Sequence, residues 1–137
     1  MKKILVIEPN LLLKENFIEL LQAEGFSVIV VKNACQALLL IQKSLPDLVI
    51  YDIEALGIFD FLNLQNLEEY LLLELLWKTA KRAKFPLVLL LNTSDICPQL
   101  ALLADTCISK PFKRVNLLTA INTHLNQTSI TKQEVML

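Results

Sequence analysis

Short apolar runs alternate with helical patterns along the whole chain, and this alternation constrains the fold more than any other feature. Five runs have the length and composition of buried strands, and in chain order they are residues 3–7 (KILVI), 26–31 (FSVIVV), 47–52 (DLVIYD), 87–91 (LVLLL) and 106–109 (TCIS). Runs this apolar do not suit a sheet with one face in water, so they indicate parallel strands covered by helices on both faces. The sequence therefore predicts an α/β fold with right-handed crossover connections.

Helical patterns fill the segments between the apolar runs. The expected helices cover about residues 10–24, 33–43, 64–84, 95–103 and 113–126. Asn10 and Asn33 suit the N-caps of the first two helices, and Gly25 suits the left-handed position that follows a helix. The polar segment 128–137 has no cap and no apolar period. We therefore expect one domain over residues 1–127 and a flexible C-terminal tail over residues 128–137.

The composition argues against several classes of function. Lys and Arg number 13 against 14 Asp and Glu, so a net charge of -1 gives no general attraction to nucleic acid or to a membrane surface. Although 54% of the residues are hydrophobic, each apolar run is far shorter than a membrane span, and the opening MKKILVIEPN is too short in apolar residues for a secretory signal. Three widely spaced cysteines and one histidine do not suit structural zinc. We expect a cytoplasmic protein that binds neither nucleic acid nor membrane.

Polar residues follow several of the expected strands. Asp52 ends the third run. Glu8 and Lys110 directly follow the first and fifth runs, and Thr93 lies two residues after the fourth. The carboxyl ends of parallel strands meet at one edge of a sheet, where binding sites collect. Carboxylates beside a lysine suit Mg²⁺ and a phosphoryl group, because oxygen ligands hold the cation and the ammonium neutralises phosphate oxygens.

Three segments at strand ends also carry a family resemblance. KKILVIE, PDLVIYD and LLADTCISKPF occur in this order, and over residues 2–126 the chain resembles the receiver domain of two-component response regulators. The resemblance implies a flavodoxin-like (βα)5 fold, a doubly wound five-stranded parallel sheet with strand order 2-1-3-4-5. It also implies that Asp52 is the phosphoacceptor, that Lys110 contacts the phosphoryl group, and that a cis peptide precedes Pro111.

The resemblance implies a Mg²⁺ site as well. Glu8 matches the first residue of the acidic pair that holds the metal in this family, and the further expected ligands are Asp52 and a backbone carbonyl near Glu54. The carboxylate of Glu54 would be a local substitution for the lost acidic residue. Pro9 stands at the second position of the pair and supplies no ligand. We expect Mg²⁺ to bind weakly or not at all, because one carboxylate is lost.

Further departures from the family pattern concern the switch. Leu91 stands where the family has a serine or threonine, and Thr93 reaches that place only with a two-residue shift of register. Cys107 replaces the aromatic residue three positions before the lysine, and Leu56 replaces a proline that usually follows the acceptor strand.

Two functions stay open at this point. The first is a single-domain response regulator that accepts phosphate on Asp52 from a histidine kinase or phosphotransfer protein and signals by contacting a downstream protein. The alternative is a phosphorylation-independent pseudo-receiver that acts as an interaction module. A flavin- or nucleotide-binding enzyme on the same fold is disfavoured, because Gly25 and Gly57 are the chain's two glycines and neither lies in a phosphate-binding loop. We expect no enzymatic activity.

The expected third helix has an unusually wide apolar arc. Leu67, Leu71, Leu75 and Lys78 follow one face, while Tyr70, Leu73 and Trp77 follow another. One interpretation is a helix lengthened into the core, with Glu74 and Lys78 paired at i, i+4. The other is an exposed apolar patch for a partner protein or for a second copy of the chain, and hence a homodimer through this helix.

Overall fold

The apolar runs pair side by side as the parallel strands of one sheet. The structure is a computed structural model, and it describes residues 1–53, 64–92 and 98–136. In chain order the strands are β1 (Lys3–Ile7), β2 (Ser27–Val31), β3 (Leu48–Asp52), β4 (Leu87–Asn92) and β5 (Thr106–Lys110). They lie in the order β2-β1-β3-β4-β5. The α/β fold class and the strand order expected from the sequence are therefore confirmed.

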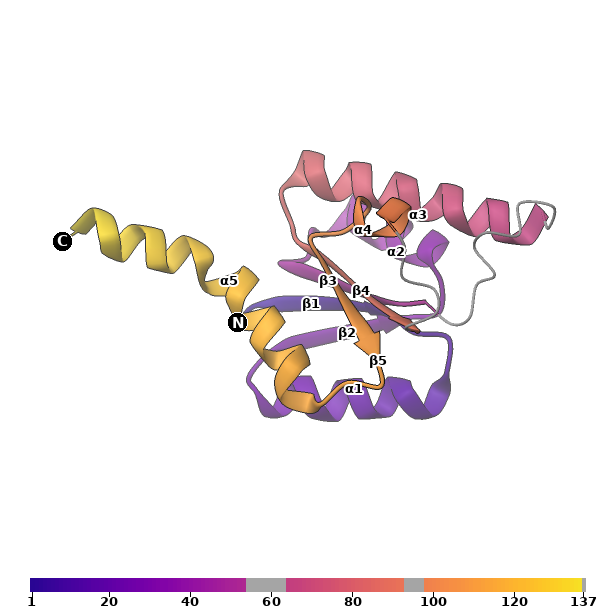
Figure 1. Ribbon diagram of the computed structural model, residues 1–137. Helices are drawn as coiled ribbons and strands as arrows, with labels where there is room; N and C mark the ends of the chain where they lie inside the picture. Colours follow the sequence, from indigo (N-terminus) through magenta and orange to yellow (C-terminus); the bar gives the residue numbers. More distant parts are fainter. Residues whose placement is uncertain (54–63, 93–97, 137) are drawn as a thin grey trace.

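Helices cover both faces of the sheet (Figure 1). They are α1 (Leu11–Ala23), α2 (Ala34–Lys43), α3 (Leu64–Ala83), α4 (Pro98–Ala101) and α5 (Arg114–Met136). Helices α1 and α5 pack on one face, where Val6 and Ile50 meet Phe17 and Leu117. Helices α2, α3 and α4 pack on the other face. Its cluster is built from Leu5, Val49, Leu89, Ala37, Leu73, Leu76 and Leu100.

Alternation along each strand produces these two cores. Val49 and Tyr51 belong to the cluster under α2 and α3, whereas Leu48 and Ile50 belong to the cluster under α1 and α5. Successive side chains of a strand point to opposite faces, so a strand buried on both sides must be apolar at every position. This requirement accounts for the continuous apolar runs.

Side chains cap the first two helices as the sequence predicts. The Asn10 side chain accepts hydrogen bonds from the backbone N–H groups of Leu12 and Leu13, at 2.9 and 3.2 Å. The Asn33 side chain accepts one from the N–H of Gln36 at 2.8 Å. Both asparagines satisfy N–H groups that have no partner within the helix.

The chain differs from the predicted boundaries at two of its elements. Helix α5 extends to Met136, ten residues beyond the expected end at residue 126, and the domain boundary and flexible tail stay predictions. Helix α4 spans only Pro98–Ala101, and the first part of the expected helix over residues 95–103 lies outside the described residues. Among the helices that the structure describes, none has both the length and the apolar composition to cross a membrane.

Helices α1 and α3 end in the same backbone turn but with different residues in its left-handed position. Gly25 has φ +88° after α1, and Lys84 has φ 62° after α3. In each turn the next residue donates to a carbonyl five positions back, from Phe26 to Leu21 and from Phe85 to Ala80, both at 3.1 Å. This is the Schellman arrangement, in which glycine avoids the strain that a Cβ brings.

Lys84→Gly should therefore raise the free energy of unfolding by about 0.5 to 1 kcal/mol, because relief of left-handed strain outweighs the entropy that glycine adds to the unfolded chain. Chemical denaturation measures the change. The matched control is Gly25→Ala, which should lower the stability although no atom lies within 4 Å of the added Cβ. A Lys84→Gly protein no more stable than the parent would contradict the assignment.

Candidate functional site

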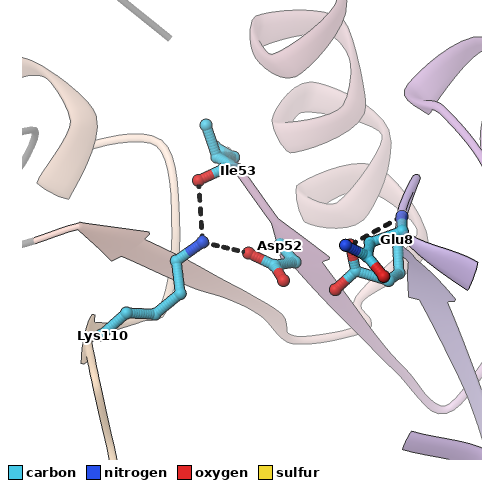
Figure 2. A network of polar contacts seen from close by, with 5 residues as sticks. Glu8, Asp52, Ile53 and Lys110 are labelled. Carbon is cyan, nitrogen blue, oxygen red and sulfur yellow. Dashed lines mark hydrogen bonds and ion pairs between the residues drawn. The ribbon is translucent and has the colours of Figure 1, made fainter. Parts of the chain in front are cut away.

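Two acidic side chains lie next to each other where β1 and β3 end. Ile7 is the register partner of Tyr51, so Glu8 and Asp52 follow on adjacent strands at the carboxyl edge of the sheet. Glu8 is 2% exposed and Asp52 is 3% exposed, and they are the buried charged residues of the described chain. Figure 2 shows both carboxylates at this edge. The structure thus brings together two residues that the sequence predicts for the site.

Lys110 reaches Asp52 from β5. Its Nζ donates to Asp52 Oδ1 at 2.5 Å and to the backbone oxygen of Ile53 at 3.2 Å. Because β4 lies between β3 and β5, the lysine side chain must cross the end of β4 (Figure 2). The peptide between Lys110 and Pro111 is cis, as the family resemblance implies. Asp52 and Lys110, both expected at the site from the sequence, are therefore in direct contact.

Glu8 connects the site to the start of α1. Its Oε2 accepts a hydrogen bond from the backbone N–H of Asn10 at 3.2 Å, across Pro9, and Asn10 in turn caps α1. Proline has no backbone N–H and its side chain has no oxygen, so Pro9 offers nothing to a cation or a phosphoryl group. The second acidic position of the family is here part of a turn into a helix.

The described donors fit a minimal Mg²⁺ site. Mg²⁺ binds proteins through one or two carboxylates and takes its remaining oxygen ligands from water and phosphate. Glu8 and Asp52 supply two adjacent carboxylates. Within the described residues no group of three or more His, Cys, Asp or Glu side chains is placed to hold a metal. Glu54, the third ligand expected from the sequence, lies outside the described residues.

Leu91 and Asn92 form the described end of the fourth strand, β4. Leu91 is fully buried in the cluster beneath α2 and α3, so this position presents no group to Asp52. Thr93 lies outside the described residues. Asn92 was not among the predicted site residues, although it ends β4 and is the register partner of Lys110. The signal in the sequence was the polar residue that closes LVLLLN, at the end of the strand that lies between β3 and β5.

A cleft of about 450 Å³ reaches Asp52 from the side of α2 and α3, and Pro9, Cys35 and Glu69 are among its lining residues. Tyr51 also lines it, and burial, aided by the charge of Glu69, raises the pKa of the Tyr51 hydroxyl. Burial and the neighbouring Glu68 raise the pKa of Glu69. The cleft therefore gives access to Asp52, and its lining includes two neighbouring carboxyl groups, those of Glu68 and Glu69.

We expect Glu69→Gln to raise the unfolding temperature at about pH 7, with a gain that shrinks as the pH falls toward about 4. When the pKa of a carboxyl group is higher in the folded state than in the unfolded state, the free energy of unfolding falls as the pH rises from the unfolded-state pKa to the folded-state pKa. Above that window the ionised Glu69 disfavours the folded state, and glutamine removes the charge. Thermal denaturation across this pH range measures the difference.

The matched control for this pH effect is Glu74→Gln. Glu74 pairs with Lys78 at 3.4 Å on the same helix, so removing its charge should give no gain at about pH 7. An equal gain from Glu69→Gln at both ends of the pH range would contradict the assignment of the shift to Glu69.

We compared the sequence with protein families and curated proteins, and the structure with solved structures. No protein-family model matches the sequence, and no curated protein matches it either. Solved structures do match. A response regulator receiver modulated diguanylate cyclase from Pelobacter carbinolicus is 28% identical, with a TM-score of 0.70 over 97% of this chain and 99% of that chain. Its similarity covers the sheet and the site-bearing strand ends together. The chain has a CheY-like receiver fold.

Two other structures extend the comparison to further receiver proteins. NtrX from Brucella abortus is 27% identical, with a TM-score of 0.71 over 99% of this chain and 29% of that chain. The chemotaxis protein CheY4 from Vibrio cholerae shares the fold at 19% identity, with a TM-score of 0.68 over 91% of this chain and 99% of that chain. The structural neighbours of this receiver-like chain are thus response regulator receiver domains.

Proposed function

We propose that the chain is a phosphorelay receiver, which accepts a phosphoryl group on Asp52 and signals through protein contacts. The observation that carries the proposal is the buried Asp52 carboxylate, held at the sheet edge by Lys110 Nζ at 2.5 Å. A strand-end aspartate without such a partner would be a common structural feature. With a cationic side chain beside it, the carboxylate has a group that neutralises an incoming phosphoryl oxygen.

The proposed chemistry is a transfer between two side chains. A carboxylate oxygen of Asp52 attacks the phosphorus of a phosphohistidine on a histidine kinase or phosphotransfer protein. The new oxygen–phosphorus bond forms as the nitrogen–phosphorus bond breaks, and the released imidazole takes a proton from water. In this proposal Lys110 neutralises the phosphoryl oxygens, and the amide of Asn92 donates a hydrogen bond to them.

Mg²⁺ held by Glu8 and Asp52, with Glu54 as a further candidate ligand, would offset the charge of the phosphoryl group when bound. In this site the side chain of Glu8 is the second carboxylate, next to that of Asp52. Since Pro9 removes one potential ligand from this edge, we propose weak metal binding. Lys110 then positions the acceptor carboxylate of Asp52. We propose no enzymatic activity for the chain.

The proposed partners are proteins. A histidine kinase or phosphotransfer protein delivers the phosphoryl group, a downstream protein receives the signal, and a second copy of the chain contacts helix α3. Nucleic acid and membrane are left out of this set because the net charge of -1 gives neither a general attraction.

A pseudo-receiver is the second candidate, and Leu91 is the observation that favours it. This side chain is 0% exposed, and it stands where the family places a hydroxyl that bonds the phosphoryl group. Together with Pro9 it leaves the acceptor with fewer stabilising contacts. In this alternative the Asp52–Lys110 pair is structural, and the chain acts by constitutive binding.

Intact mass spectrometry separates the two candidates. With acetyl phosphate and Mg²⁺ in excess, we expect the mass to rise by one phosphoryl group, and Asp52→Asn to abolish the rise because an amide cannot form an acyl phosphate. The matched control is Asp47→Asn. Asp47 is bonded to the backbone of Lys3 at the opposite end of the sheet, so this variant should still be phosphorylated. No gain at saturating donor would contradict the receiver proposal and favour the pseudo-receiver.

A further inference from the structure

The outward face of α3 carries an exposed stripe with a regular spacing. The stripe consists of Glu68, Leu71, Leu75, Lys78 and Arg82. Leu71 is 54% exposed and Leu75 is 51% exposed, and the steps of three and four residues place all five side chains on one helix face. The core contacts of α3 come from its other side, through Leu73 and Leu76. Figure 1 shows α3 along the outside of the molecule.

The Glu74–Lys78 pair expected for a helix lengthened into the core is present at 3.4 Å, but the exposures of the leucines do not fit a helix that only fills the core. A helix lengthened only to fill the core would bury its leucines, yet Leu71 and Leu75 stand half exposed beside Lys78, whose side chain is 66% exposed. Two large aliphatic side chains one turn apart form an apolar patch with charged residues on both sides. Patches of this kind mark contact sites.

Four of the five stripe residues lie symmetrically about Leu73. Leu71 and Leu75 lie two positions from it, and Glu68 and Lys78 lie five positions from it on opposite sides. If a second α3 runs antiparallel, Leu71 meets Leu75 of the partner subunit and Glu68 meets Lys78 of the partner subunit. In a contact between two identical surfaces, each residue pair occurs twice around the two-fold axis, so the paired residues must lie at equal distances from the axis along the helix.

Charge along α3 supports the antiparallel direction. Glu68 and Glu69 stand near one end, while Lys81 and Arg82 stand in the last turn. Burial and, after it, the charge of Glu68 raise the pKa of Glu69 within one chain, so a partner's cation beside Glu68 would relieve the repulsion between these two carboxylates. A parallel pairing would instead place like charges together. The net charge of -1 sets little general repulsion between copies.

We propose that two copies of the chain pair through the α3 stripes, antiparallel, about a two-fold axis that passes Leu73. This pairing rests on the proposed function in one respect, because a second copy of the chain is among the proposed partners. Phosphorylation of Asp52 plays no part in it. A single pair of helices makes a small interface. The dimer should therefore be weak, with a dissociation constant of about 1 μM to 1 mM.

Sedimentation equilibrium without phosphodonor, from about 1 μM to about 1 mM protein, tests this pairing. The parent chain should show a monomer–dimer equilibrium. Leu71→Glu or Leu75→Glu should raise the dissociation constant about tenfold or more, because each variant places two carboxylates in the contact. Glu68→Lys and Lys78→Glu should each weaken the dimer, and the double variant should restore it to within about threefold.

Three features of this experiment keep its outcome clear. Leu12→Glu is the matched control, because Leu12 is 78% exposed on α1 and outside the stripe, and it should leave the equilibrium unchanged. Asp52→Asn should also leave it unchanged, which separates this inference from the receiver proposal. Restoration by the double charge reversal cannot come from unfolding.

Three results would overturn the pairing. A chain that stays monomeric at about 1 mM would assign the stripe to a different occupant, such as a helix of another protein. Association that survives Leu71→Glu would place the contact elsewhere. A double variant weaker than both single charge reversals would exclude the antiparallel register.

Discussion

The ion pair between Asp52 and Lys110 is the interaction around which the functional edge of this fold is organised. A carboxylate that is 3% exposed needs a cation or several hydrogen bonds, because an uncompensated buried charge costs several kcal/mol. Lys110 supplies the cation from β5, across the end of β4. The strand order therefore has a chemical consequence, since it brings one lysine to both Asp52 and the backbone of Ile53.

On the other side of the edge, Glu8 connects the site to the first helix. Glu8 is buried beside Asp52, and its Oε2 accepts a hydrogen bond from the N–H of Asn10 across Pro9. The short segment from Glu8 to Asn10 thus leads from β1 into the N-cap of α1. A carboxylate at the position of Pro9 would serve a metal, whereas proline serves the turn. The described edge thus has Lys110 in contact with Asp52 and two adjacent carboxylates, those of Glu8 and Asp52.

Much of the fold could be predicted from the sequence, because strands buried on both faces must be apolar throughout and because Asn10, Asn33 and Gly25 carry local cap chemistry. Other features depend on tertiary packing. Periodicity left open whether Leu71 and Leu75 face the core or solvent, and only their exposure settles that point. Lys84 in a left-handed conformation has no sequence signal of its own beyond the nearby Pro86, and the position of Asn92 opposite Lys110 follows from strand register.

We propose that the edge formed by Asp52 and Lys110 binds a phosphoryl group. Amide NMR spectra recorded during titration with beryllofluoride and Mg²⁺ test this most directly, because this anion imitates a phosphoryl group on a carboxylate. We expect saturable shifts of the amide signals of Asp52, Lys110 and Asn92, and we expect Asp52→Asn to abolish them. Spectra that stay unchanged at saturating beryllofluoride would contradict it.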